Sequence, residues 1–468
     1  MTAVYRGHIF HVAGSPTIAD AASNLVSLPD GALVVGDDGT IAWIGSFAEL
    51  PRAFAGADVE RTDYIIPGFV DAHLHYAQGF ATAAHSGGQL LEWLQQCIFP
   101  MESRFEDEGF SDYAARYFTR RRIAAGTTAA MVFGSAFPTA QDALYRHTRD
   151  AGLRIVSGRG VQTTGPAASA TLQTSEATAV RLVAEEIERW HAVDTGDPTT
   201  AQIQVAVVPR FALSVTRETL AALGELYADV RESGVYFHSH LNENNRPVDG
   251  EIAAVKATFG VDHYLDTYDG LFMPGSARGG QSLLGRRSVL AHAVHCHDDE
   301  LARMAETGAS IAHCPTSQLF LGSGTMPWRR TLNAGVTVAL GSDIGAGDEW
   351  LMSRVLGDCY KVHISEEGSA GVALHPAELL FTGTLAGARA LDMEDRFGNF
   401  DVGKDADFLL IDTSLWEPLE AMLSHGVRSD DEASATFEEL FTLLMGLRQP
   451  AIAGVFVQGA RAVAPNLD

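Results

Sequence analysis

Lysine is the scarcest charged residue in this 468-residue chain. It occurs only at Lys256, Lys361 and Lys404, so arginine carries nearly all of the positive charge and lysine-dependent chemistry has three candidates. Positively charged residues as a whole are also few. The chain has 33 Lys and Arg residues against 59 Asp and Glu residues, which gives a formal net charge of −26. A surface of that sign repels a phosphate backbone, so we expect no nucleic-acid partner and favour a small, uncharged or cationic ligand.

Cysteines and long apolar runs are equally sparse. The four cysteines lie far apart and form no C-x-x-C pair, which favours reduced thiols over a disulfide framework. No run of 18 apolar residues is free of charge, and the start of the sequence lacks the charged and apolar segments of a signal peptide. We therefore expect a cytoplasmic protein with no membrane partner. The acidic balance suits high solubility, and adaptation of the host to salt would produce the same balance.

From residue 65 onward, short apolar β-branched runs alternate with longer amphipathic segments of helical period. This alternation is typical of repeated βα units and a parallel sheet, and eight strands predict an α/β fold built on a (β/α)8 TIM-like barrel. The predicted strands are Tyr64–Val70, Thr127–Phe133, Arg154–Val161, Ile203–Val208, Val235–Ser239, Ser288–Ala293, Ser310–Ala312 and Val336–Leu340.

The two ends of the chain have a different pattern. GALVVGDDGTIAWIG near the start, and DADFLLIDTS and GVFVQGARAV near the end, are short alternating strands broken by Asp-Gly and Gly turns. We expect residues 1–65 and 395–468 to form one small discontinuous β-sandwich domain, with part of 415–448 helical or loop, beside a barrel of residues 66–394. Two separate β-extensions fit the sequence equally well.

Histidines occur in pairs at the ends of two predicted strands. IIPGFVDAHLHYAQ places His73 and His75 two residues apart after an apolar strand, so both imidazoles project on the same side and can share one ion. VYFHSHLNEN repeats the spacing with His238 and His240, followed by Glu243. His240 lies further along the strand exit and is the predicted ligand, whereas His238 is expected to pack or to support a ligand.

Two further strand ends supply His292 in VLAHAVH and Asp343 in VTVALGSDIGAG. Because catalytic groups gather at the carboxyl-terminal rim of a parallel barrel, we expect these side chains to converge there. Three imidazoles and a carboxylate suit zinc or iron(II) better than calcium or magnesium. Such an ion lowers the pKa of its bound water to around 7, and Asp343 could both touch the ion and accept the proton of that water.

This set of residues resembles the amidohydrolase superfamily and, within it, the guanine deaminase family, over about residues 66–454. The broader motifs are PGFVDAHLH and LGSD, and the more specific ones are LLEWLQQCIFPMESRF, PRFALS and the stretch from HCPTS to LGSG. SHLNEN and GNFDVGKDADFLLID also carry the resemblance. The resemblance implies one Zn²⁺ per chain, with Fe²⁺ as the other candidate, and a homodimer. It also implies a purine substrate, deaminated hydrolytically from guanine to xanthine and ammonia in purine catabolism.

The resemblance also assigns roles to individual residues. It implies metal ligation by His73, His75, His240 and Asp343, proton transfer by Glu243, and positioning of water or intermediate by His292, with Asp343 assisting in catalysis. Gln78, Arg210 and Phe211 fall on its substrate-binding positions. An arginine fork and a glutamine amide suit the lactam oxygen and ring nitrogens of a purine. The alternatives are a structural ion pair for Arg210 and barrel packing for Phe211.

The sequence departs from the family pattern at three places. Gln318 stands where asparagine is more common, His85 lies in an altered loop over residues 79–92, and the segment 270–287 looks longer than usual. Both loops are candidate lids or plain insertions. These departures keep 8-oxoguanine, a pterin or a triazine open as substrates of a related aminohydrolase, and a catalytically silent binding module as the least favoured reading.

Two further features bear on the number of metal ions. The fourth predicted strand, IQVAVVPRFALS, contains no lysine that could bridge a second ion, so a single ion is expected. His292, His295, Cys296 and His297 together resemble a metal site, but the following acidic residues predict a helix start, which favours exposed histidines in a capping region. Cys314 is expected to be a buried packing residue.

Overall fold

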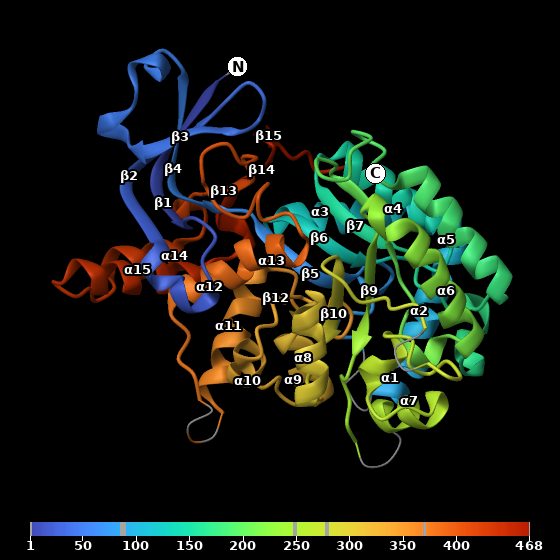
Figure 1. The fold of residues 1–468 in the computed structure, drawn as a ribbon. Coiled ribbons are helices and arrows are strands. Elements are labelled where there is room, and N and C mark those ends of the chain that lie inside the picture. The colour runs from blue at the N-terminus through green and yellow to red at the C-terminus, as the bar shows by residue number, and fades with distance from the viewer. Residues whose placement is uncertain are drawn as a thin grey trace.

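The computed structural model describes residues 2–84, 90–246, 250–276, 280–366, 368 and 371–467. It contains two sheets, one of eight strands and one of seven (Figure 1). The smaller sheet is built from both ends of the chain, and the larger is wrapped by helices. The fold is therefore the predicted TIM-like barrel with a small β domain.

The seven-stranded sheet joins the two ends of the chain directly. Strand β13 pairs antiparallel with β4, with Leu409 opposite Ile66, so the alternative of two separate β-extensions is wrong. The order is β15-β14-β13-β4-β1-β2-β3. The strands are β1 (Ala3–Val12), β2 (Leu25–Val35), β3 (Ile41–Ser46), β4 (Asp58–Pro67), β13 (Phe408–Ile411), β14 (Ile452–Val457) and β15 (Ala460–Arg461).

The eight-stranded sheet runs in chain order with every neighbouring pair parallel. Just after the last strand, the backbone N–H of Asp343 donates to the carbonyl oxygen of His73 on the first strand at 2.8 Å, which brings the two edges of the sheet together. The strands are β5 (Phe69–His75), β6 (Thr127–Phe133), β7 (Arg154–Gly158), β8 (Ile203–Val207), β9 (Tyr236–Leu241), β10 (Ser288–His292), β11 (Ser310–His313) and β12 (Val338–Leu340).

Helices cover the outside of the barrel, and the longer ones begin at side-chain caps. Asp107 accepts from Phe110 N at the start of α3, and Ser175 accepts from Thr178 N at the start of α5. The helices are α1 (Leu90–Trp93), α2 (Phe99–Ser103), α3 (Glu108–Ala124), α4 (Pro138–Asp150), α5 (Glu176–Trp190), α6 (Arg217–Val230), α7 (Glu251–Phe259), α8 (Asp298–Thr307), α9 (Pro315–Leu321), α10 (Trp328–Asn333), α11 (Met352–Ile364), α12 (Pro376–Gly383), α13 (Leu385–Ala390), α14 (Glu417–His425) and α15 (Glu432–Gly446).

The predicted strand Tyr64–Val70 is wrong, because the chain changes sheets inside it. Tyr64 to Pro67 end β4 of the smaller sheet, and β5 of the barrel begins at Phe69. Gly68 lies at the crossing, where a Cβ would come within 2.3 Å of the Thr128 side chain, so the chain has room there only for glycine. His73 and His75 consequently lie within a barrel strand rather than after one.

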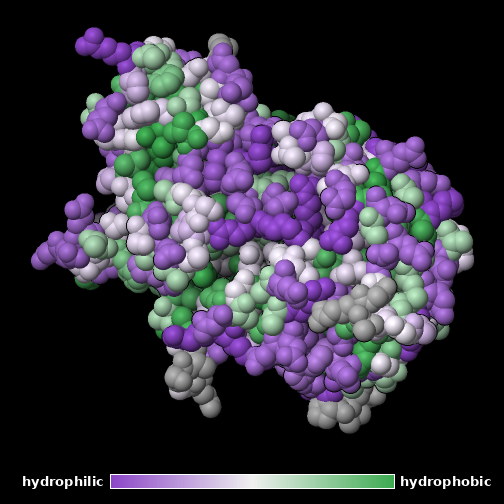
Figure 2. All heavy atoms as spheres, in the orientation of Figure 1, coloured by the Kyte–Doolittle hydropathy of each residue, from purple (hydrophilic) through white to green (hydrophobic). Residues whose placement is uncertain are grey.

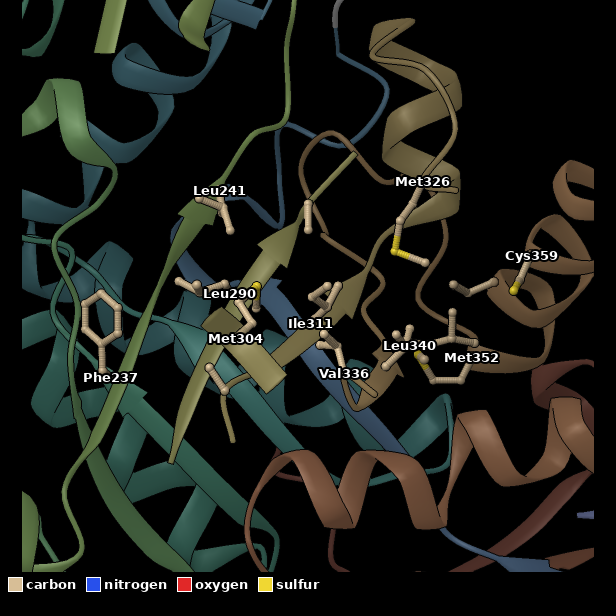
Figure 3. Packing of buried hydrophobic residues seen from close by; sticks show 14 of the residues in the cluster. Phe237, Leu241, Leu290, Met304, Ile311, Met326, Val336, Leu340, Met352 and Cys359 are labelled. Carbon is tan, nitrogen blue, oxygen red and sulfur yellow. The ribbon is translucent and has the colours of Figure 1, made fainter. Parts of the chain in front are cut away.

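A continuous apolar core fills the space between the barrel strands and the outer helices (Figure 3). Leu290 on β10, Ile311 on β11 and Leu340 on β12 share this cluster with Met304 of α8 and Cys359 of α11. Each side chain is fully buried, which fixes the strands and therefore the loops at their carboxyl-terminal ends.

The outer surface is mixed. On the face shown in Figure 2, hydrophilic side chains predominate and hydrophobic ones form small scattered areas. Among the described residues, no helix combines the length and the apolar character that crossing a membrane requires.

Candidate active site

The four predicted metal ligands converge at one end of the barrel. His73 and His75 lie on β5, His240 lies on β9, and Asp343 follows β12. Oδ1 of Asp343 lies 3.2 Å from Nε2 of His73 and 3.3 Å from Nε2 of His75. Nε2 of His240 lies 3.2 Å from Nε2 of His75. Three imidazole nitrogens and one carboxylate oxygen therefore face a common point.

Hydrogen bonds on the far side of two imidazoles determine which nitrogen faces that point. Nδ1 of His238 donates to the carbonyl oxygen of Val289 at 2.7 Å, so Nε2 of His238 accepts from Nδ1 of His73 at 2.9 Å. Nδ1 of His240 likewise donates to the carbonyl oxygen of Arg210 at 2.7 Å. Because each neutral imidazole carries one N–H, Nε2 of His73 and Nε2 of His240 present lone pairs. His238 thus holds the predicted ligand His73 through a hydrogen bond.

This arrangement fits a metal cation. Lone pairs on neighbouring nitrogens and a carboxylate oxygen repel one another unless a positive charge lies between them. Nε2 of His73 is buried and has no hydrogen-bond partner among the described residues. Nitrogen-rich ligands with outward N–H groups held by carbonyl oxygens are typical of zinc or iron(II) sites. The residues present therefore fit one such ion.

Local electrostatics favour neutral imidazoles at His75 and His240 and an ionised carboxylate at Asp343. Burial lowers the pKa of His75 to about 4, and burial with the neighbouring histidines lowers that of His240 well below its usual range. Burial opposes ionisation of Asp343, but contacts with His73 and His75 hold its pKa well below the usual range. Neutral imidazoles and a carboxylate are the protonation states that a metal ion requires.

The backbone is strained at two of the site residues. His292 at the end of β10 has φ 73°, and Asp343 after β12 has φ 51°. Such left-handed conformations are uncommon for residues other than glycine and persist only where the surroundings impose them. A register shift between Asp71 and Leu74 adds one residue to β5 relative to β6, beside His73. Departures from regular strand geometry thus cluster where the predicted ligands lie.

Glu243 and His292 lie against this centre from the β9 and β10 ends. Oε2 of Glu243 is 3.4 Å from Nε2 of His292, which is 4.0 Å from Oδ2 of Asp343. Burial, followed by the charges of Glu251 and Asp343, raises the pKa of Glu243 well above its usual range. Burial lowers the pKa of His292 to about 3. Glu243 is therefore a carboxylic acid that can deliver a proton, beside a neutral imidazole.

A small cavity opens onto these groups. The residues of the predicted centre that line it are His75, His240, Glu243, His292 and Asp343, and the predicted substrate residues Gln78, Arg210 and Phe211 line it as well. Apolar side chains, among them Trp93 and Leu321, complete the wall. An apolar cavity with a few polar groups is the expected form of a site for a small flat ligand.

The two structural alternatives, an ion pair for Arg210 and packing for Phe211, are also present in the structure. Arg210 forms a buried ion pair with Glu102, with Nη2 3.0 Å from Oε1, and Phe211 packs in an apolar cluster. Each residue nevertheless lines the cavity. The structure thus places them at the site without assigning them a role.

Sequence reasoning missed three cavity-associated residues. Trp93 and Glu251 line the cavity, and Glu102 contacts two of its lining side chains, Gln78 and Arg210. Trp93 and Glu102 lie inside the motif LLEWLQQCIFPMESRF, so that motif was an available signal. Glu251 accepts hydrogen bonds from the backbone N–H groups of Glu243 and Asn244, each at 3.2 Å, and no motif pointed to it.

The departures from the family pattern have different outcomes. His85 lies outside the described residues, as do residues 277–279 of the longer segment. Gln318 is buried in α9, and neither polar atom of its amide has a partner among the described residues. Its effect on substrate choice stays open.

Of the histidines after β10, His297 is exposed as the capping interpretation predicts, whereas His295 is half-buried. His297 is the exposed N-cap of α8, its backbone N–H donates to Glu300 at 2.8 Å, and Nε2 of His295 bonds the carbonyl oxygen of Ser323.

Cys314 is buried, and burial raises the pKa of its thiol well above the usual range. The strand β8 contains no lysine, as its sequence IQVAV requires.

Comparisons with known proteins agree with this geometry. The chain matches the amidohydrolase family over residues 64–461. It is 37% identical over 446 residues to a probable guanine deaminase of Deinococcus radiodurans, covering 93% of this chain and 94% of that protein. It is 34% identical over 431 residues to guanine deaminase of Escherichia coli, covering 91% and 89%. The solved E. coli guanine deaminase matches the structure with a TM-score of 0.85 at 30% identity, over the full length of both chains. The chain therefore belongs to the amidohydrolase family, in the branch that contains these guanine deaminases.

Proposed function

We propose that this chain is a zinc-dependent guanine deaminase, a hydrolase that converts guanine and water to xanthine and ammonia in purine catabolism. One observation carries the proposal beyond family membership. One cavity is lined by three of the predicted ligands, His75, His240 and Asp343, and also by Arg210 and Gln78. A ring bound through its lactam edge to those two side chains would have its amino-bearing carbon near the centre.

His73, His75, His240 and Asp343 would hold one zinc ion per chain, with iron(II) as the other candidate. When bound, such an ion supplies Lewis acidity that lowers the pKa of water to near neutrality. Asp343 is ionised and can accept a proton from water at this position.

Glu243 is the proposed proton carrier. Its raised pKa favours a proton on the carboxyl, which it can deliver to the ring nitrogen. The carboxylate left behind can take up the proton released by the attacking water and deliver it to the departing amine, and the hydroxyl proton of the tetrahedral carbon then restores the acid as the new carbonyl forms. His292 lies 3.4 Å from Glu243 and burial lowers its pKa, so as a neutral imidazole it can orient water or the oxygen on the tetrahedral carbon by hydrogen bonding without adding charge. Phe211 and Trp93 line the cavity and would pack on the faces of the ring.

The test is to incubate the zinc-loaded protein with guanine and to follow ammonia release together with the ultraviolet change to xanthine. Rapid formation of both products in equal amounts supports the proposal. No turnover of guanine, at one zinc per chain, would refute guanine as the substrate. The same ammonia assay with 8-oxoguanine, a pterin and a triazine would then identify a related aminohydrolase, and failure of every substrate would leave a binding module.

Three further properties are proposed, the first from the family resemblance and the other two from composition and sequence pattern. The protein is a homodimer, which light scattering tests, and it acts in the cytoplasm, which fractionation of the host tests. Residues 1–65 with 395–468 form one domain and 66–394 the other, and limited proteolysis tests that division.

A further inference from the structure

A single carboxylate oxygen links the two polar side chains that are proposed to read the substrate. Oε1 of Glu102, on the short helix α2, accepts a hydrogen bond from Nε2 of Gln78 at 2.9 Å. The same oxygen lies 3.0 Å from Nη2 of Arg210. Glu102 is 8% exposed, so water does not compete strongly for these bonds.

The carboxylate determines which way the Gln78 amide faces. An ionised carboxylate only accepts hydrogen bonds, so it holds the NH₂ group of Gln78 and leaves Oε1 as the free polar atom of that amide. Oε1 lies against Gly345, where a Cβ would come within 2.0 Å of it. No hydrogen bond from the described residues reaches Oε1. The amide is thus held on one side by Glu102 and on the other by glycine backbone.

The carboxylate also cancels the charge of Arg210 at this end of the cavity. A buried guanidinium without a partner would attract carboxylates and phosphates, whereas the ion pair is neutral overall. The guanidinium also lies over the ring of Phe99, with Cζ 5.2 Å from the ring centroid. Nε of Arg210 is buried and has no acceptor among the described residues, so this N–H is an unsatisfied donor in a residue that lines the cavity.

We propose that Glu102 is a positioning residue. It orients Arg210 and Gln78 so that an N–H donor of Arg210 lies beside the acceptor Oε1 of Gln78. This donor–acceptor pair selects heterocycles with a neutral lactam edge. In guanine that edge is the carbonyl oxygen on C6 next to the N1–H. The order is reversed in an amidine edge, where a ring nitrogen accepts and an amino group donates. This inference rests on the proposed function, and it specifies the substrate class of the same site.

The test compares guanine with 2-aminopurine, which keeps the amino group on C2 but lacks the oxygen on C6 and the proton on N1. We expect the wild type to favour guanine by about 100-fold or more in kcat/KM, because a site built to bond a group rejects the analogue lacking it. Glu102→Gln keeps the shape of the side chain, but the new amide can also donate a hydrogen bond. The Gln78 amide can then rotate so that its NH₂ group and Oε1 exchange places. The preference should fall by about 10-fold or more, through a higher KM for guanine, with zinc content unchanged.

Two controls separate this role from plain structural support. Glu186→Gln alters another buried carboxyl, which bonds Tyr145 on the outer face of the barrel at 2.9 Å, and should leave the preference unchanged. A double-mutant cycle of Glu102→Gln with Gln78→Leu should be non-additive, because the first change acts through the second side chain. Equal losses for both substrates, or full additivity, would overturn the proposal.

Binding measurements keep the inference separate from the proposed function. The fluorescence of 2-aminopurine reports its Kd, and displacement reports the Kd of guanine, without any turnover. If guanine is not deaminated but Glu102→Gln still lowers the Kd preference by about 10-fold, the proposed function fails and the inference stands. If guanine is deaminated and both preferences are unchanged in the variant, the inference alone fails. No binding of guanine overturns both.

Discussion

Replacing Glu243 by glutamine should remove most of the catalytic rate while leaving the metal in place. Glutamine has the same shape but cannot carry a proton between ring nitrogen and leaving amine. Positioned proton transfer contributes about 10²- to 10⁴-fold, which corresponds to about 3–5 kcal/mol of activation free energy. Since Glu243 is fully buried and 3.4 Å from His292, the variant keeps the local packing, and we expect kcat to fall by that factor with KM within a few-fold.

The assay measures ammonia and xanthine with zinc-loaded wild type and Glu243→Gln, alongside the zinc content of each. Zinc should stay at one per chain, because the four predicted ligands that converge at the site do not include Glu243. Glu186→Gln is the matched control, since it removes a buried carboxyl that is absent from the cavity lining. A kcat within about three-fold of wild type would refute proton transfer by Glu243. A loss of zinc in step with the loss of rate would instead make Glu243 part of the metal site.

Four further outcomes follow from the structure. Gly345→Ala forces a residue at φ 128° and places Cβ against the Gln78 amide, so KM for guanine should rise about 10-fold or more while zinc is retained. Burial raises the pKa of Glu186 from 4.5 to about 7, so between these pH values the folded state holds a proton that the unfolded chain releases. This proton contributes up to about 3 kcal/mol to the free energy of unfolding, in full below pH 4.5, and the contribution is lost as the pH rises through 7. Urea unfolding at pH 5 and pH 8 should show that dependence in the wild type and a flatter one in Glu186→Gln. Chelation should lower Tm and added zinc should restore it, because an ion bound at 1,000 times its Kd stabilises the fold by about 4 kcal/mol. Leu290→Ala should lower the free energy of unfolding by about 2–5 kcal/mol at pH 7, because that side chain is fully buried in the core.

The predicted site residues lie together because the barrel is regular enough to be deduced from pattern. Each predicted ligand lies in the last three residues of a barrel strand or within three residues after one, and parallel strands bring those ends to one rim. The resemblance to a known family added the substrate residues, and a separate motif of that family, LLEWLQQCIFPMESRF, contains Trp93 and Glu102. The roles of all these residues stay predictions until the variants are measured.

Contacts between distant segments escaped prediction for a common reason. Strand patterns reveal apolar periodicity but not partners, so the passage from β4 to β5 at Gly68 was read as one strand. The pairing of β13 with β4 decides between one β domain and two extensions, and no local pattern contains it. The sequence does not point to Glu251, because Glu251 accepts a hydrogen bond from the backbone N–H of Glu243. Every residue except proline has such an N–H, so no side-chain pattern marks the contact.

The sequence by itself determined the fold class, the acidic surface and the types of donor available to a metal, because these depend on composition, periodicity and residue chemistry. Only the tertiary structure decided what each donor faces. The bond from His238 to His73 sets which nitrogen carries a lone pair, and Glu102 sets which atom of Gln78 stays free. Both depend on hydrogen bonds between groups that are far apart in the chain, and those bonds exist only once the barrel has brought the groups together.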